Sequence, residues 1–154
     1  MLDLLRANAP LPKRPYNRGS NISVVGALRL SGISALYPYD GAVDSSQFLS
    51  FLDEKLIPTL KPGDAVVMDN VRIHHIGEVA EKIEAQKARV LYLPTYHPEL
   101  NPIEEAWSKI KNTLKKAEAR TIAAYVDALE SAKAAVSPEN IAAWFRHAGY
   151  ALID

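Results

Sequence analysis

Two carboxylates, Asp69 and Glu104, are placed where they could act together on a metal ion. Asp69 ends the apolar run AVVMD, and Glu104 follows a second apolar run, RVLYLP, after a short loop. Mg²⁺ and Mn²⁺ prefer such hard oxygen ligands and complete their shell with water and phosphate oxygens. Two such ions about 4 Å apart can activate an attacking oxygen and stabilise a leaving one. The residue types therefore point to metal-dependent chemistry on phosphodiesters.

The elements around the two acids predict that they converge. A helix predicted over residues 76–87 links the two apolar runs, and a strand–helix–strand crossover makes the two strands parallel. Their carboxyl ends then lie at one edge of the sheet. Asp69 ends one strand, and Glu104 lies in the first turn of the helix that follows the other. Open α/β sheets usually place their sites at this edge.

Each of these residues also has a simpler interpretation. The segment NPIE at 101–104 fits a helix start, with Asn as N-cap, Pro at the first helical position and Glu three residues after the cap. Asp69-Asn70 fits a turn or the cap of the next helix. His74 fits a surface or core histidine as well as an accessory group at the same edge. Trp107 is most simply a core anchor of its helix.

The rest of the pattern predicts an α/β chain. The runs NISVVGALRL and ISALYPY, separated by Ser31-Gly32, are typical of a hairpin. A helix with apolar residues at helical spacing is expected over 45–57, and three more over 101–119, 121–135 and 138–147. The predicted order is β-β-α-β-α-β-α-α-α. Residues 1–20, which contain three prolines, are expected to be irregular.

The composition is that of an ordinary globular protein. Of 154 residues, 48% are hydrophobic and 23% charged, and eighteen basic residues balance eighteen acidic ones. The absence of cysteine excludes disulfide scaffolds, thiolate zinc sites and cysteine nucleophiles. No apolar run approaches the roughly 20 residues of a membrane span, and the first residues lack the apolar centre of a secretory signal. We therefore expect a cytoplasmic protein.

Two longer motifs carry more information than the isolated acids. They are VVMDNVRIHH at 66–75 and LPTYHPELNPIEEAWSKIK at 93–111, and thirty-four residues separate Asp69 from Glu104. Together these motifs and this spacing resemble the catalytic domain of DDE transposases of the Tc/mariner superfamily, in its bacterial insertion-sequence branch. The second motif is similar to the family pattern at nearly every fixed position. The resemblance covers about residues 13–118.

The resemblance implies a ribonuclease-H-like fold and a site of two aspartates and one glutamate that binds Mg²⁺ or Mn²⁺. It also implies that transposon-end and target DNA are the partners, whose strands are cleaved and transferred. Carried over residue by residue, Asp69 would be the second acidic ligand and Glu104 the third. Asn70, His74 and Glu105 are candidate accessory residues.

The start of the chain departs from the family pattern. The family's first Asp lies on a central strand before the hairpin, whereas only a Pro-rich basic segment precedes the hairpin here. Asp3, within MLDLL, has too little apolar sequence around it for a buried central strand of typical length. We therefore expect an α/β, ribonuclease-H-like fold that lacks its first central strand. Residues 1–20 would be a basic leader, and 21–154 an N-terminally truncated catalytic domain with C-terminal helices.

Basic residues cluster on both sides of the candidate site, although the whole chain is neutral. At 100° per residue, Lys111 lies about 20° from Glu104 on the helix wheel, which suits contact with a phosphate. A solvated helix face with pairs such as Glu105–Lys109 explains the same pattern. The residues predicted to contact DNA are Lys13, Arg14, Arg18, Lys109, Lys111 and Lys115.

Three function classes follow. The first is an incomplete transposase catalytic domain, with weak or no strand transfer alone, that acts as a homodimer or with an upstream transposase fragment. The second is a non-catalytic remnant that binds DNA or a full-length transposase. The third is an unrelated α/β domain whose acids cap helices, and the motif at 93–111 argues against it.

Overall fold

A five-stranded sheet forms the centre of the part of the chain that the structure describes. The computed structural model describes residues 2–10, 22–70 and 72–150, with residues 2–10 and 73 as backbone alone. The strand order is β3-β2-β1-β4-β5. Neighbours among β1, β2 and β3 are antiparallel, whereas β4 is parallel to both β1 and β5. The strands are β1 Leu2–Pro10, β2 Ile22–Arg29, β3 Gly32–Asp40, β4 Ala65–Met68 and β5 Arg89–Tyr92.

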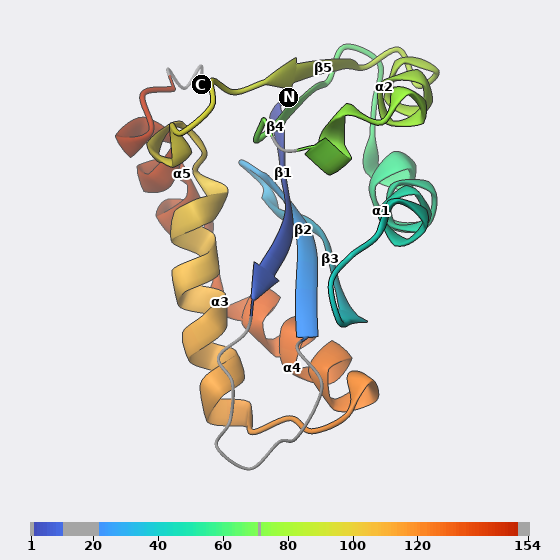
Figure 1. The fold of residues 1–154 in the computed structure, drawn as a ribbon. Helices are drawn as coiled ribbons and strands as arrows, with labels where there is room; N and C mark the ends of the chain where they lie inside the picture. Colours follow the sequence, from blue (N-terminus) through green and yellow to red (C-terminus); the bar gives the residue numbers. More distant parts are fainter. Residues whose placement is uncertain (1, 11–21, 71, 151–154) are drawn as a thin grey trace.

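Helices cover both faces of this sheet (Figure 1). Strand β2 is buried along its whole length because its side chains alternate between two cores. On one face Val24 and Leu28 pack with residues of α3, α4 and α5. On the other face Val25 and Ala27 pack with residues of α1 and α2. The helices are α1 Ser45–Phe51, α2 Gly77–Glu84, α3 Ile103–Ala117, α4 Ile122–Ala135 and α5 Pro138–His147.

Strand β1 shows that the expected absence of a first central strand was wrong. Leu2–Leu5 pair with all of β4, and β1 also pairs with β2 between Leu4 and Pro10. An empty position between β2 and β4 would leave unpaired backbone groups on both, which is costly inside a protein. Residues 2–10 fill it despite their mixed composition, so this part of the expected leader is regular. The basic residues expected at 13, 14 and 18 lie outside the described residues.

The other predicted elements are confirmed, with one difference. The hairpin, the two short parallel strands and the helices after them lie where the pattern placed them. The helix expected over 45–57 begins at its capping box on Asp44 but does not continue as one α-helix. It changes to a π-helix at Leu52–Leu56 and then to a 3₁₀ turn at Ile57–Thr59. Pro58 lies in that turn, and a proline removes an amide donor that a continuing helix needs.

Helix α3 packs closely on β2 because residue 26 is a glycine. A Cβ at Gly26 would lie 3.0 Å from Cη2 of Trp107 and 2.9 Å from Cδ1 of Leu36. The prediction that Trp107 anchors its helix in the core is confirmed, since the side chain is 1% exposed. Glu104 lies one turn before Trp107 on the same helix. The Gly26–Trp107 contact therefore fixes how close the start of α3 comes to the sheet.

A buried ion pair joins two strands at the end of the sheet opposite Asp69. Arg29, the last residue of β2, donates to the carboxylate of Asp64, just before β4, and the two side chains are 7% and 4% exposed. The amide of Lys61 also donates to Asp64, at 2.8 Å. Burial alone would raise the pKa of Asp64, but the hydrogen bonds from Arg29 and Lys61 hold that pKa below its ordinary value.

No helix in the described ranges is both long enough and apolar enough to span a bilayer.

Candidate functional site

Asp69 follows directly on β4, at the carboxyl edge of the parallel strands. It is half-buried, and two polar contacts fix it. The side-chain amide Nδ2 of Asn101 donates to Asp69 Oδ1 at 2.9 Å, and the Asp69 carbonyl lies 2.7 Å from Nδ1 of His74. Its second carboxylate oxygen, Oδ2, has no hydrogen-bond partner among the described residues. One oxygen is thus held by the protein, and the other is available to a ligand.

Asn101 connects Asp69 to the start of α3. Besides donating to Asp69, its side-chain oxygen accepts from the amide of Ile103 at 3.3 Å, and its carbonyl accepts from the amide of Glu104 at 3.1 Å. The residue is 1% exposed. The interpretation of NPIE as a helix start is therefore correct in part. The same asparagine that supports the helix start also holds the carboxylate of Asp69.

His74 supports the backbone of Asp69 from the α1 side of the sheet. Its ring is fully buried beside Phe48, with the ring centroids 5.1 Å apart. Burial lowers the pKa of His74, so the ring is neutral at pH 7. A carbonyl can only accept, so Nδ1 must carry the proton it donates to Asp69. His74 thus holds the main chain of Asp69 and does not line the pocket described below.

Asn70 joins the loop after β4 to the loop after β5. Its amide Nδ2 donates to Oγ1 of Thr95 at 2.9 Å, and its side-chain oxygen contacts Nε2 of His75. The His75 ring stacks on Tyr92 of β5, with centroids 4.0 Å apart. The prediction that Asn70 is an accessory residue stays a prediction. Its observed contacts are with the two loops that border Asp69.

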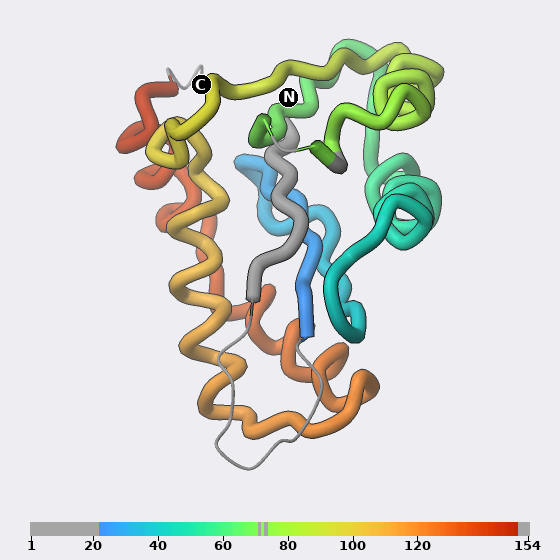
Figure 2. The backbone as a smooth tube through the Cα atoms, in the orientation of Figure 1, coloured from blue at the N-terminus to red at the C-terminus, as the bar shows by residue number. Residues whose placement is uncertain are grey.

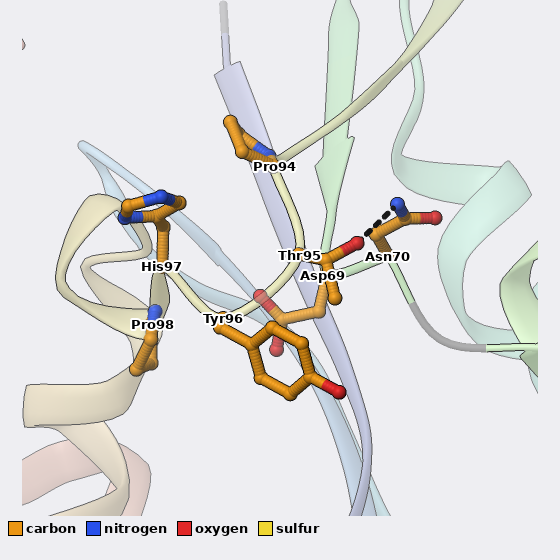
Figure 3. A pocket seen from close by; sticks show the side chains of 7 residues that line it. All are labelled: Asp69, Asn70, Pro94, Thr95, Tyr96, His97 and Pro98. Atoms are coloured by element: carbon orange, nitrogen blue, oxygen red, sulfur yellow. Dashed lines mark hydrogen bonds between the residues drawn. The ribbon is translucent and has the colours of Figure 1, made fainter.

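A pocket of about 340 Å³ opens between these two loops. Figure 3 shows Asp69 and Tyr96 in its middle, with Asn70 on one side and His97 and Pro98 on the other. The remaining lining residues are Pro94 and Thr95. The loop that contains Pro94–Pro98 runs from β5 to the start of α3, as the backbone trace in Figure 2 shows.

Glu104 and Glu105 differ in their surroundings. Glu104 begins α3 and is one backbone hydrogen bond from Asn101, which holds Asp69. Glu105 contacts Nδ1 of His147 on α5, so its observed partner lies away from Asp69. The carboxylates of Asp69 and Glu104 are both partly exposed at the same edge. Asn101 thus links the end of β4 to the start of α3, and the convergence of the two carboxylates themselves stays a prediction.

Asp69 and Glu104 stay the candidate metal ligands, and the described residues add no larger donor set. No group of three or more Asp, Glu or His side chains in the described ranges is gathered as a metal centre. Mg²⁺ is nevertheless commonly held by one or two carboxylates, with waters and substrate phosphates completing the shell. The unpartnered Oδ2 of Asp69 beside an open pocket fits that manner of binding.

The backbone register of β1 places Asp3 away from the level of Asp69. Asp3 pairs with Val66, and Leu5 pairs with Met68, the residue before Asp69. Three residues along a strand correspond to about 10 Å. Asp3 thus lies in the central strand, but it is not level with Asp69. The sequence alone did not lead us to expect a central strand at this position.

The basic residues predicted to contact DNA fall into three groups. Lys109 donates to Oδ1 of Asn140 at 2.7 Å, which ties α3 to the start of α5. Lys111 is half-buried and Lys115 exposed on α3. Lys13, Arg14 and Arg18 lie outside the described residues.

Sequence reasoning missed two features of this site. Asn101 was considered only as a cap, and nothing in one sequence could show that its amide reaches a residue 32 positions earlier. Tyr96 was not considered at all. An aromatic residue within the loop TYHP, shortly after the strand β5, is the signal that could have found it.

Comparison with known proteins places this arrangement in a family. A family model described as DDE superfamily endonuclease matches residues 7–125. The fold is similar to the catalytic domain of Mos1 mariner transposase, with a TM-score of 0.70 and 15% identity over 96% of this chain and 74% of that one. The predicted ribonuclease-H-like fold is therefore confirmed.

Larger assemblies contain the same fold. The Mos1 strand transfer complex matches with a TM-score of 0.65 and 16% identity, over 96% of this chain and 50% of that chain. A simian T-cell lymphotropic virus intasome matches with a TM-score of 0.66 and 14% identity, over 84% and 47%. This chain spans about half the length of those two chains. No curated protein sequence gives a significant match.

Proposed function

Because the chain belongs to the DDE superfamily endonuclease family, we propose that it is the catalytic domain of a Tc/mariner-like transposase that cleaves and joins DNA strands. One observation carries the proposal. Asp69 and Glu104, the two acids that match the family motifs, lie at the same sheet edge and are linked through Asn101. Membership of the bacterial insertion-sequence branch stays a prediction.

The proposed cofactor is Mg²⁺ or Mn²⁺, held by Asp69 and Glu104. A bound divalent ion would supply charge for the attacking and leaving oxygens of a phosphodiester. The chain's own contribution is orientation, since Asn101 fixes one oxygen of Asp69 and His74 fixes its backbone. Mos1 paired-end complexes with Mg and with Mn share the fold, at 17% and 14% identity, which supports this choice of ions.

DNA is the proposed partner, at transposon ends and at the target. On α3, Lys111, Lys115 and Lys116 make no side-chain hydrogen bond or ion pair within the described part of the chain. Phosphate contacts by Lys111 and Lys115, the two of them predicted to contact DNA, would give salt-dependent affinity. A homodimer, or association with an upstream transposase fragment, stays a prediction.

A second candidate function follows from the register of β1. Asp3 is level with Val66 and not with Asp69, so among the described residues no third acid is gathered with the two candidate ligands. A domain with two of three acids would bind DNA or a full-length transposase with little chemistry of its own. We therefore expect weak strand cleavage, and weak or no strand transfer, by this chain alone.

The test is metal-dependent nicking of a DNA duplex by the purified chain, compared with Asp69→Ala and Glu104→Gln. Asp53→Asn is the matched control, because Asp53 is an exposed acid paired with Lys82 on the α1 side, where loss of a surface pair costs little. Nicking lost in the two site variants and kept in the control supports the nuclease. Nicking that survives Asp69→Ala refutes it, and robust strand transfer by the wild-type chain refutes the expected weakness.

A further inference from the structure

Tyr96 is an aromatic side chain that the fold leaves in solvent. It is 93% exposed, and Leu91, at 45%, is the only other large hydrophobic residue exposed to this degree in the described ranges. Its neighbours in the pocket, Pro94 and Pro98, limit the conformations of the loop on both sides. An exposed aromatic on a loop beside a pocket is a recognised mark of a binding site.

The backbone at Tyr96 is held against its local preference. Its φ angle is +64°, in the left-handed region that suits glycine and is an outlier for a bulky side chain. The preceding residue, Thr95, is anchored by the hydrogen bond from Asn70. Such outliers persist where the surrounding structure enforces them, and they cluster at functional sites. The loop thus keeps the ring in solvent at an energetic cost.

The ring lies on the pocket that also contains Asp69 (Figure 3). We propose that Tyr96 stacks on an unpaired DNA base next to the phosphate on which the Asp69–Glu104 site acts. This inference rests on the proposed function, and it assigns the pocket a nucleobase as its ligand. Stacking suits a site that must accept many sequences, because every base has a π-face.

Binding measured without chemistry tests the inference. The full chain is titrated, in buffer containing EDTA, with a duplex that carries a single-stranded overhang containing 2-aminopurine and with the same duplex made blunt. Tyr96→Ala should weaken binding of the overhang duplex by about 5- to 150-fold, the range expected for one stacked base. Tyr96→Phe and Tyr96→Trp should retain binding and the fluorescence quenching that stacking causes. Leu91→Ala, the exposed apolar control on β5, should change neither.

Tyr96→Gly separates binding from folding. Glycine adopts the observed φ without strain, so this variant should unfold at a temperature no lower than wild type while losing the overhang affinity. Overhang affinity unchanged in Tyr96→Ala, or equal losses on the blunt duplex, would overturn the inference.

The outcomes also distinguish the inference from the function on which it rests. If the chain nicks DNA through Asp69 but Tyr96→Ala leaves its overhang affinity unchanged, only the base contact is contradicted. A chain that binds the overhang through Tyr96 but never nicks DNA contradicts the nuclease alone. A chain that binds neither duplex contradicts both.

Discussion

Replacing Asn101 with aspartate tests whether its contact with Asp69 holds the site together. The two side chains have the same shape, and an aspartate oxygen can still accept from the amide of Ile103, so support for the helix start is kept. The substitution removes only the donor that Asp69 accepts from at 2.9 Å and puts a second carboxylate there. The variant therefore tests the contact of Asn101 with Asp69 without removing its support for the start of α3.

The magnitude follows from that distance. A hydrogen bond to a charged group contributes about 1.5–3 kcal/mol, and two like charges about 3 Å apart repel by about 5 kcal/mol at an effective dielectric constant of 20. The folded variant can escape this repulsion by keeping one proton between the two carboxyls. At pH 7 that proton costs about 4 kcal/mol, because an ordinary carboxyl titrates about three units lower and each unit corresponds to 1.36 kcal/mol. We expect Asn101→Asp to destabilise the metal-free protein by about 2–4 kcal/mol at pH 7.

The sign of the pH dependence is fixed by the same proton. Near pH 7 the folded variant holds a proton that the unfolded chain has released, so its stability falls as pH rises and recovers on acidification toward pH 4. Mn²⁺ should reverse the effect, because the extra carboxylate adds a hard ligand beside Asp69. Urea unfolding followed by tryptophan fluorescence, at pH 7 and pH 5 with and without Mn²⁺, measures each of these changes.

The same substitution at another asparagine is the matched control. Asn140 accepts from the ammonium of Lys109 at 2.7 Å, so Asn140→Asp places a new carboxylate against a cation. It should be neutral or slightly stabilising at pH 7. If Asn101→Asp unfolds at the wild-type urea concentration at pH 7, or if Asn140→Asp is destabilised equally, Asn101 does not hold Asp69 in the way described.

Two further predictions concern the framework of the site. Gly26→Ala should lower the free energy of unfolding by about 1–3 kcal/mol, because the new Cβ would meet Leu36 and Trp107. In the double variant, Trp107→Phe should recover part of this loss, as measured by urea unfolding. If the effects of the two substitutions on the free energy of unfolding simply add, the contact between the two positions is contradicted. Asp64→Asn should cost about 3–5 kcal/mol at pH 7, since it leaves the Arg29 charge buried. Because the pKa of Asp64 is held below its ordinary 3.8, its contribution is complete above that pH and lost below it. The difference from wild type should therefore shrink in urea titrations toward pH 3, and a constant difference would argue against the pairing.

The spacing of apolar residues predicted those elements whose apolar positions are also the positions buried in the fold. Strand β2 is apolar at nearly every position because both of its faces are covered, and α3 shows a regular apolar stripe because one face packs on the sheet. Strand β1 was missed because its sequence, LDLLRANAP, alternates poorly and is followed by prolines. Its conformation is supported by pairing with β2 and β4, which are distant in sequence.

The candidate site could also be predicted only in part. The common edge of Asp69 and Glu104 followed from the crossover rule, whereas their metal-dependent chemistry stays a prediction from residue type. The contacts that position them did not, because Asn101 and His74 act through atoms whose direction depends on tertiary packing. The left-handed backbone of Tyr96 is likewise a property of the folded loop, since no local rule assigns that conformation to tyrosine.

The register of β1 links the fold to the expected weakness of the chemistry. A central strand parallel to β4 is the element that would carry a third carboxylate to the level of Asp69. In this register Leu5 is level with Met68, and Asp3 is about 10 Å back along the strand. The strand therefore completes the sheet without placing its aspartate beside the second acid. The continuity of the sheet depends on the backbone pairing of β1, whereas catalysis depends on which of its residues is level with Asp69.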